Sequence, residues 1–273
     1  MIKIAAAVVL REWRVQRRYP ISMVNLVLLT PLYQLALPTL LLGAAFMVNG
    51  SAVGLSQMTG TTDLAGWIGL GMLSASLLAG VVNSAYNTLD ADRVTGVIEH
   101  SWSTPAPREA YVIGSVLTGT IYASAASLIL LAFAIVVLHA SFDLGGSLLA
   151  VPIAAVMVVG NCGFGYLVAA AVLTMRRADA LVEIATMIAV LFSGVTFPLT
   201  LLPDVARWFT YLLPGTWGLD LIRQLTLSTR PLAPIPLALA GLALTSVVWF
   251  VVGRRVFLRA ERLLRTAGTL TQY

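Results

Sequence analysis

Long apolar segments recur along this chain, and they constrain its fold more than any other feature. A helix needs about 20 mostly apolar residues to cross the hydrocarbon core of a membrane. Six segments meet or approach that length, namely 21–48, 66–86, 111–139, 148–174, 181–197 and 232–253. We therefore predict an all-α polytopic membrane protein with six transmembrane helices, folded as one domain over residues 1–273.

The composition agrees with this class of protein. Charged residues make up 11% of the chain, against about 25% in a typical soluble domain. Cys162 is the single cysteine, so no disulfide forms within the chain. The net charge is +5, but the basic residues gather near the ends of the apolar segments. We therefore predict contact with membrane lipids and no nucleic-acid partner.

The basic residues also predict the orientation in the membrane. With both termini inside, 14 of the 17 Lys and Arg residues fall on the inner side, which leaves Arg207, Arg223 and Arg230 outside. Inner loops of membrane proteins collect Lys and Arg, so we expect both termini in the cytoplasm. The Ala-, Val- and Arg-rich, Lys-poor composition is typical of a GC-rich bacterium, and we expect a bacterial cytoplasmic membrane.

Residues 1–20 precede the first apolar segment and combine basic and aromatic side chains. Helical spacing places Ile4, Val8, Val15 and Tyr19 on one side, with most of the arginines elsewhere. We predict an interfacial helix along the inner leaflet, and the alternative is a basic tail that only sets the topology. The residues that would mark this helix are Arg11, Trp13, Arg14, Arg17 and Arg18.

The longest inner loop covers residues 87–110 and reads NTLDADRVTGVIEHSWSTPAPREA. A short helix over about 94–103 would expose Val97, Ile98 and Trp102 among charged residues, and Pro105 and Pro107 would end it. Exposed apolar side chains of this kind favour contact with another protein. The alternative is a loop that folds back onto the membrane surface.

Residues 193–225 lie between the last two apolar segments and form no ordinary loop. Pro198, Pro203 and Pro214 divide the segment, while Leu201, Trp208, Phe209 and Trp217 keep it apolar. Such a segment is tolerated at membrane depth only where protein or a water cavity shelters its backbone. We predict broken helices at the outer face that either dip into the membrane as re-entrant segments or lie on its surface, which makes this segment a candidate gate or lid.

Several kinds of chemistry are absent from the sequence. Lys3 is the only lysine and no glycine run precedes it, so the chain has no Walker-type ATP site. The two histidines, His100 and His139, form no metal-binding motif, and no G-x-S-x-G elbow occurs. We predict no catalytic residue, no metal and no cofactor in this chain. No chain of carboxylates crosses the apolar segments, so the energy source for any transport lies elsewhere.

Uncharged polar residues occur within or beside the apolar segments. They permit two interpretations: interhelical hydrogen bonds, or a weakly polar wall along a path for an amphiphilic substrate. The candidate path residues are Asn25, Gln34, Asn83, Tyr86, Thr186, Ser193 and Thr196.

Three motifs together resemble one family. They are the basic tail REWRVQRRYP, the inner loop RVTGVIEHSWSTPAPREAYVIG and the segment SGVTFPLTLLPDVARWFTYLLPGTWGLDLIRQL. The chain resembles, over essentially its whole length, the membrane subunit (permease) of type-2 ABC exporters, a group that includes daunorubicin-resistance permeases and polysaccharide exporters. In the third motif, the outer-gate residues that match the family pattern include Phe197, Pro198, Leu201, Pro203, Pro214 and Arg223.

The resemblance implies a set of partners. Two ATP-binding cassette subunits would bind ATP and Mg²⁺, and a second permease copy or a paralogue would complete the transporter. The loop helix would dock on the ATPase, the N-terminal helix would brace that junction, and spans one, two and five would line the path. The implied ATPase contacts are Thr95, Gly96, Val97, Ile98, Glu99, Trp102 and Ser103.

The substrate follows less directly from the residues. The apolar segments carry no arginine cluster that would bind anionic sugars or phosphates. We therefore expect export of a hydrophobic or amphipathic compound, namely a drug, an antibiotic or a lipid. The alternatives are a polysaccharide or glycolipid exporter on the same architecture, and a membrane sensor or assembly subunit that transports nothing.

Overall fold

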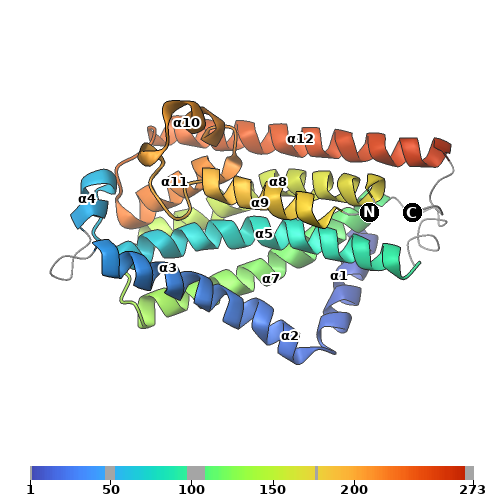
Figure 1. Cartoon of the computed structure of the whole chain (residues 1–273), viewed down its shortest axis with the longest axis horizontal. Helices are drawn as coiled ribbons and strands as arrows, with labels where there is room; N and C mark the ends of the chain where they lie inside the picture. Colours follow the sequence, from blue (N-terminus) through green and yellow to red (C-terminus); the bar gives the residue numbers. More distant parts are fainter. Residues whose placement is uncertain (1, 47–52, 97–107, 176–177, 268–273) are drawn as a thin grey trace.

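The computed structural model describes residues 2–46, 53–96, 108–175 and 178–267, and these residues form helices and no strand. Figure 1 shows long helices side by side in one bundle, with α1 running steeply across them near one end. The elements are α1 (Ile2–Gln16), α2 (Pro20–Val24), η1 (Asn25–Leu29), α3 (Thr30–Phe46), α4 (Val53–Thr59), α5 (Leu64–Val94), α7 (Arg108–Val136), α8 (Leu144–Thr174), α9 (Asp179–Phe192), η2 (Leu199–Leu201), α10 (Asp204–Thr210), α11 (Pro214–Leu227) and α12 (Ile235–Ala267).

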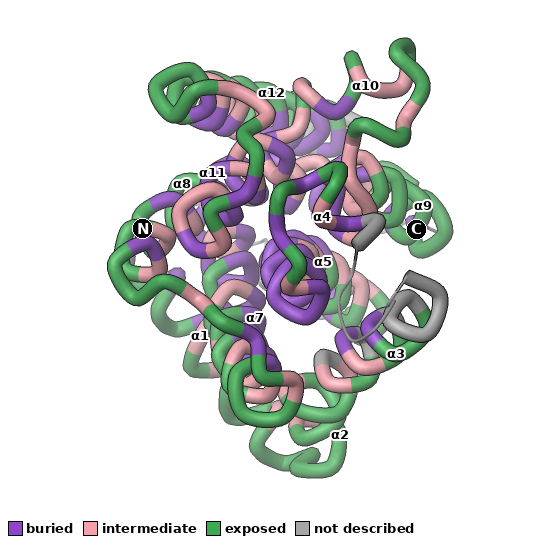
Figure 2. Tube along the Cα trace, turned by 90° about the vertical axis from the view of Figure 1, so that its left-hand side faces the viewer, coloured by how far each residue is buried: buried purple, intermediate pink, exposed green. Residues whose placement is uncertain are grey.

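Helix α5 forms the centre of the bundle. In its most apolar stretch 67% of the residues are buried, against 17% in α12 at the periphery. Figure 2 looks along the bundle and shows the buried α5 encircled by the other long helices. Each of the three clusters of buried apolar side chains contains α5 residues, such as Leu89 near one end and Ile68 and Leu70 near the other. The position of α5 therefore organises the packing of the remaining elements.

Four of the six predicted spans are helices long and apolar enough to cross a membrane: α5, α7, α8 and α12. The predicted first span corresponds to α2, η1 and α3, which follow one another without a gap and include a π-helical turn over Asn25–Leu29. The predicted fifth span corresponds to α9, whose 14 residues extend about 21 Å at 1.5 Å per residue. The count of six spans stays a prediction.

Helices α5 and α12 continue well beyond the predicted span boundaries, to Val94 and Ala267. The added turns of α5 are polar, and they remain helical because neighbouring elements supply partners. Arg93 donates hydrogen bonds to the carbonyl oxygens of Val172 and Met175 at the end of α8, at 2.8 and 2.6 Å. Hydropathy marks where the apolar core ends, and tertiary contacts decide where the helix ends.

The predicted loop 87–110 is correspondingly shorter than expected. Its first residues belong to α5 and its last three to α7. Gly96 ends α5 with a φ of 72°, and its N–H donates to the carbonyl of Arg93. Glycine takes this left-handed conformation without steric cost. The short helix predicted over about 94–103 therefore does not start at Val94, and residues 97–107 lie outside the described residues.

The proline-rich segment 193–225 is divided into η2, α10 and α11. Pro198 and Pro203 immediately precede the first two helices, and Pro214 opens the third. Helix α11 packs against α5, α8 and α12. Helix α10 instead exposes Trp208 and Phe209 at the edge of the bundle (Figure 1). The breaks match the predicted broken helices, while the re-entrant depth stays a prediction.

Candidate functional site: a charged junction, a polar pocket and a buried anchor

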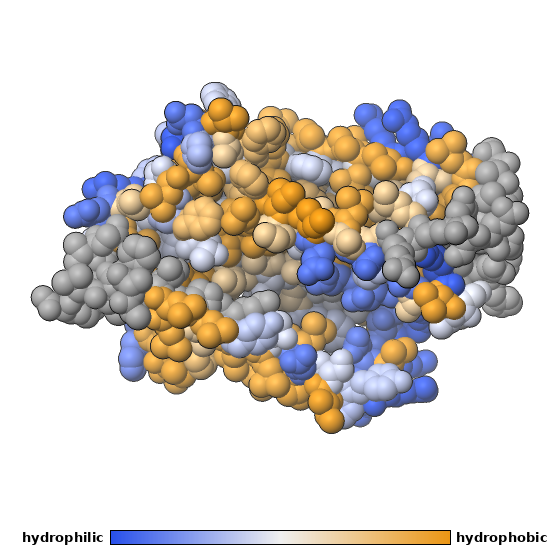
Figure 3. All heavy atoms as spheres, viewed as in Figure 1, coloured by the Kyte–Doolittle hydropathy of each residue, from blue (hydrophilic) through white to orange (hydrophobic). Residues whose placement is uncertain are grey.

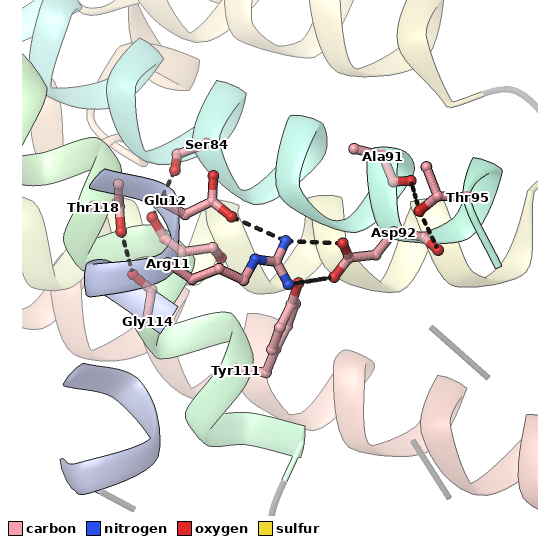
Figure 4. Close-up of polar contacts among 10 residues, drawn as sticks. Arg11, Glu12, Ser84, Ala91, Asp92, Thr95, Tyr111, Gly114 and Thr118 are labelled. Carbon is pink, nitrogen blue, oxygen red and sulfur yellow. Dashed lines mark hydrogen bonds and ion pairs between the residues drawn. The ribbon is translucent and has the colours of Figure 1, made fainter. Parts of the chain in front are cut away.

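A cluster of polar side chains joins three helices at one end of the bundle (Figure 4). The Arg11 guanidinium in α1 donates two hydrogen bonds to the Asp92 carboxylate near the end of α5, at 3.0 and 2.8 Å. The Tyr111 hydroxyl in α7 donates to the same carboxylate, and Arg11 donates to the Tyr111 oxygen at 3.0 Å. Bidentate Arg–carboxylate pairs of this kind are strong and directional. We call Arg11, Asp92 and Tyr111 the junction.

The junction keeps Arg11 charged. Burial by itself lowers the pKa of Arg11, but the hydrogen bond to Asp92 and the charges of Tyr111, Asp92 and Glu12 raise it above the usual range. The Asp92 side chain is only 7% exposed, whereas that of Arg11 is 40% exposed. The pair is therefore sheltered on one side and accessible to solvent on the other.

Further ion pairs tie the start of α7 to α12. Arg108 lies 3.2 Å from Glu261, and both side chains are largely buried. Arg254 lies 3.0 Å from Glu109. Both helices that flank residues 97–107 are therefore fastened to other elements, α5 to α1 and α8, and α7 to α12.

The structure describes part of the predicted partner contact. The Thr95 hydroxyl donates to the carbonyl of Ala91 at 2.8 Å, and Gly96 ends the helix. The other predicted contacts, Val97, Ile98, Glu99, Trp102 and Ser103, lie outside the described residues.

Helix α1 forms over the region predicted as an interfacial helix. Arg14, Arg17 and Arg18 are exposed. The Trp13 ring lies nearly parallel to that of Tyr122 in α7, with centroids 6.3 Å apart. Arg11 differs from Arg14, Arg17 and Arg18 because its guanidinium binds the carboxylate of Asp92 in α5.

The sequence interpretation missed α1 as a packing partner of α7. Ala5 and Val8 are buried, whereas Val15 and Tyr19 on the predicted apolar face are exposed. A Cβ on Gly114 would lie 2.6 Å from the Cβ of Val8, so this glycine permits the close approach of the two helices.

A polar pocket of about 200 Å³ lies beside the junction, between α1, η1, the start of α3, α5 and α7. Hydrophilic side chains are visible along this part of the surface in Figure 3, in contrast to the apolar surface over much of the bundle. Asn83 and Asn87 in α5 are four residues apart and therefore share one helix face. That spacing was the available sequence signal for the pocket. The polar residues that line it include Glu12, Gln16, Asn83, Ser84, Asn87 and Tyr122.

The remaining predicted path residues are dispersed. Thr186 lines an apolar pocket of about 200 Å³ between α5, α8, α9 and α12, and its hydroxyl donates to the carbonyl of Val182. Ser193 is buried and donates to the carbonyl of Ala189. Asn25 is exposed, whereas Tyr86 and Thr196 are half-buried. The side chain of Gln34 is not among those described. The six described side chains do not share one pocket within a single chain.

The opposite end of the bundle holds a buried arginine. Arg223 in α11 is 4% exposed and donates to the carbonyl oxygens of Gly194, Val195 and Trp67, at 2.8, 2.9 and 2.9 Å. Its guanidinium carbon also lies 3.5 Å from the centre of the Trp67 ring. We call Arg223 with these three carbonyls the anchor. It fastens α11 to the start of α5 and to the turn that follows α9.

The other predicted gate residues lie around the anchor with different degrees of burial. Pro214 is buried, Phe197 and Pro198 are half-buried, and Leu201 and Pro203 are exposed. Within the described residues no group of three or more His, Cys, Asp or Glu side chains is placed to hold a metal ion.

Comparison with known protein families decides the class of this membrane protein. The family model of the ABC-2 type transporter matches residues 5–227, from α1 to the end of α11. The chain belongs to the ABC-2 type transporter family. The match covers the junction, the polar pocket and the anchor of this ABC-2 permease. A comparison with curated proteins gave no match.

Membership confirms the family predicted from the three motifs. An ABC-2 permease is the multi-pass membrane component of an ABC transporter and not its catalytic ATPase. The family also implies association with ABC ATPase subunits.

Proposed function

We propose that this permease is the membrane subunit of an ATP-driven exporter that moves a hydrophobic or amphipathic compound out of a bacterial cell. The compound would be a drug, an antibiotic or a lipid. The observation that carries the proposal is the junction, because it ties α1 to both helices that flank the predicted ATPase contact.

The charged end of the bundle would face the cytoplasm and the anchor would face outward. This orientation places 14 of the 17 basic residues inside, as inner loops of membrane proteins require. Both termini would then be cytoplasmic, in the bacterial cytoplasmic membrane.

The transport cycle would begin at two ATPase subunits, each of which binds ATP and Mg²⁺. Their closure would move the segment 95–107, and α5 and α7 would carry that motion to α1 and α12 through the ion pairs. A second permease copy or a paralogue would complete the path. At the outer end η2, α10 and α11 would form the gate, held to α5 by Arg223.

Two pockets of the described residues support an amphipathic substrate. One is apolar and lies beside α9, and the other carries amides, hydroxyls and a carboxylate. Neither of these two linings contains an arginine or a lysine, and basic groups are what an anionic glycan or a phosphate would require. A third pocket, of about 280 Å³ beside the anchor, is lined by Arg223 and Arg230, but both guanidinium groups already donate to backbone carbonyls.

The first experiment identifies what co-purifies with the tagged chain from its native membrane in mild detergent. We expect an ATPase with Walker motifs in stoichiometric amount, and a second permease in the same eluate would indicate a heterodimer. Absence of an ATPase under several gentle conditions would contradict the proposal and favour the sensor or assembly subunit. Stimulation of the ATPase by a lipid-linked glycan and not by drugs would favour the polysaccharide exporter.

The second experiment tests the junction in the reconstituted complex. We expect Arg11→Ala and Asp92→Asn to lower transport per ATP hydrolysed, as should Glu99→Ala and Trp102→Ala in the predicted contact. Arg14→Ala is the matched control, because Arg14 is an exposed arginine of the same helix. If transport per ATP hydrolysed were the same in Arg11→Ala and in the control, the junction would have no role in coupling ATP hydrolysis to transport.

A further inference from the structure

The polar pocket carries an excess of negative charge. Glu12 lines it, and its side chain is 14% exposed with one oxygen 3.0 Å from the Arg11 guanidinium. That guanidinium is also bound to Asp92 through two hydrogen bonds. One positive charge therefore serves two carboxylates, and the lining supplies no further Lys or Arg.

Polar groups in the pocket have hydrogen-bonding capacity to spare. The Tyr122 hydroxyl is buried and has no partner within the described residues. The amides of Asn83 and Asn87 are exposed, and they make no hydrogen bond to the described chain. Both α5 and α7 are candidate membrane spans, where an unsatisfied polar group is costly. These groups are consistent with a polar ligand.

The pocket also has apolar lining residues, so the site is amphipathic. They are Leu26 of η1, Ala79 of α5, and Ala123 and Ala126 of α7. The neighbouring turns of α2 and η1 expose large apolar side chains such as Ile21. A ligand with a polar head and an apolar tail would satisfy both parts.

We propose that the polar pocket binds the protonated amine head group of an amphiphile, with Glu12 as its counter-ion. Asn83, Asn87 and Tyr122 would hydrogen-bond the head group, and the tail would lie along Leu26 and the alanines. This inference rests on the proposed function, since export of an amphipathic compound gives the pocket its role. The amine-bearing amphiphile would be either a bilayer lipid or a compound that enters from solution.

The test measures binding of dodecylamine and of dodecanol, which share a chain length, to the full chain in phosphatidylcholine nanodiscs. We expect tighter binding of the amine. Glu12→Gln should weaken amine binding about tenfold or more, the factor that loss of a charge-assisted hydrogen bond produces, and leave dodecanol binding unchanged. Glu183→Gln is the control, because it removes an exposed carboxylate of α9 outside the pocket lining.

Asn83→Ala provides a second variant that leaves the junction intact. It should weaken binding of both probes by a similar factor, because an amide hydrogen-bonds an amine and an alcohol alike. An amine affinity in Glu12→Gln equal to that of the unmodified chain, or no preference for the amine in the unmodified chain, would overturn the inference.

Nanodiscs that contain phosphatidylethanolamine distinguish the two sources of the ligand. Competition by this lipid, which carries a primary amine, would indicate a bilayer lipid, and unchanged dodecylamine binding would indicate an amphiphile from solution. The binding assay needs no ATPase. If the amine does not bind, the inference about the pocket is wrong and the proposed exporter function is unaffected. If no ATPase co-purifies, the proposed function is wrong and the binding result is unaffected.

Discussion

The two ends of this permease each depend on an arginine, and the two arginines are held in opposite ways. Arg11 at one end is 40% exposed in its side chain and binds the carboxylate of Asp92. Arg223 at the other end is 4% exposed and binds three backbone carbonyls. The first interaction joins two charged side chains on separate helices, and the second joins a side chain to the backbone.

The difference indicates which end can rearrange. A partly exposed ion pair exchanges partners at modest cost because water solvates the separated charges. Withdrawal of a buried guanidinium leaves both the charge and its carbonyl partners unsatisfied. We therefore expect the junction to break and re-form during transport, while the anchor stays closed and holds the gate on α5.

The largest expected effect comes from the anchor. Arg223→Leu leaves the carbonyls of Gly194 and Val195 without their donor, at about 1–3 kcal/mol for each buried group, whereas the Trp67 carbonyl lies within α5 and keeps its helical donor. We expect a loss of several kcal/mol, seen as a large drop in thermal unfolding temperature in detergent. Arg207→Ala is the control in the same segment, because Arg207 also donates to two carbonyls but is more exposed. An equal drop in unfolding temperature for both variants would show that the burial of Arg223 does not increase its contribution to stability.

A smaller effect is expected at the junction. Asp92→Asn removes the charge that Arg11 and Tyr111 bind, and solvent screening of the exposed Arg11 limits the loss to about 1–3 kcal/mol. The exchange Arg11→Asp with Asp92→Arg should recover part of it. High salt should weaken the unmodified junction and leave the anchor unaffected. If high salt left the contribution of the junction to stability unchanged, the contrast drawn between the two ends would be wrong.

Glu12 predicts a pH dependence at the charged end. Burial raises the pKa of Glu12 above its usual range, Arg11 lowers it, and Asp92 raises it further. The folded protein thus binds this proton more tightly than the unfolded chain, and the resulting stability is lost as the pH rises through the raised pKa. Glu12→Gln should therefore be slightly more stable than the unmodified chain at neutral pH, with the two converging in acid. A difference in stability between Glu12→Gln and the unmodified chain that is the same at every pH would contradict this prediction.

The smallest loss of stability is expected for the exposed ion pair between Arg254 and Glu109. The Arg254 side chain is 47% exposed in its pair with Glu109, and exposed pairs contribute about 0–1 kcal/mol. Arg254→Ala should therefore change the unfolding temperature little. Arg108→Ala should cost more, because Arg108 and Glu261 are largely buried. A larger loss of stability for Arg254→Ala than for Arg108→Ala would show that burial does not determine how much these ion pairs contribute.

The sequence predicted the breaks within the segment 193–225 and missed the contact between Arg11 and Asp92. Pro198, Pro203 and Pro214 predicted broken helices because proline removes a backbone donor and restricts its neighbour. The basic and aromatic composition of residues 1–20 placed Arg11 at the membrane surface. Its partner Asp92 lies 81 residues away in the chain. No local pattern links two residues at that separation.

The sequence alone determined the class of protein, the family and the positions of most apolar helices, because hydropathy and proline act over a few turns of chain. Tertiary structure alone decided that α5 is central, that Arg223 meets a carbonyl 156 residues away, and that Glu12, Asn83 and Tyr122 share a pocket. These contacts join elements that are distant in the chain, and the packing of whole helices brings them together. The physical reason is that periodicity specifies which face of a helix is apolar, and packing specifies which neighbour that face meets.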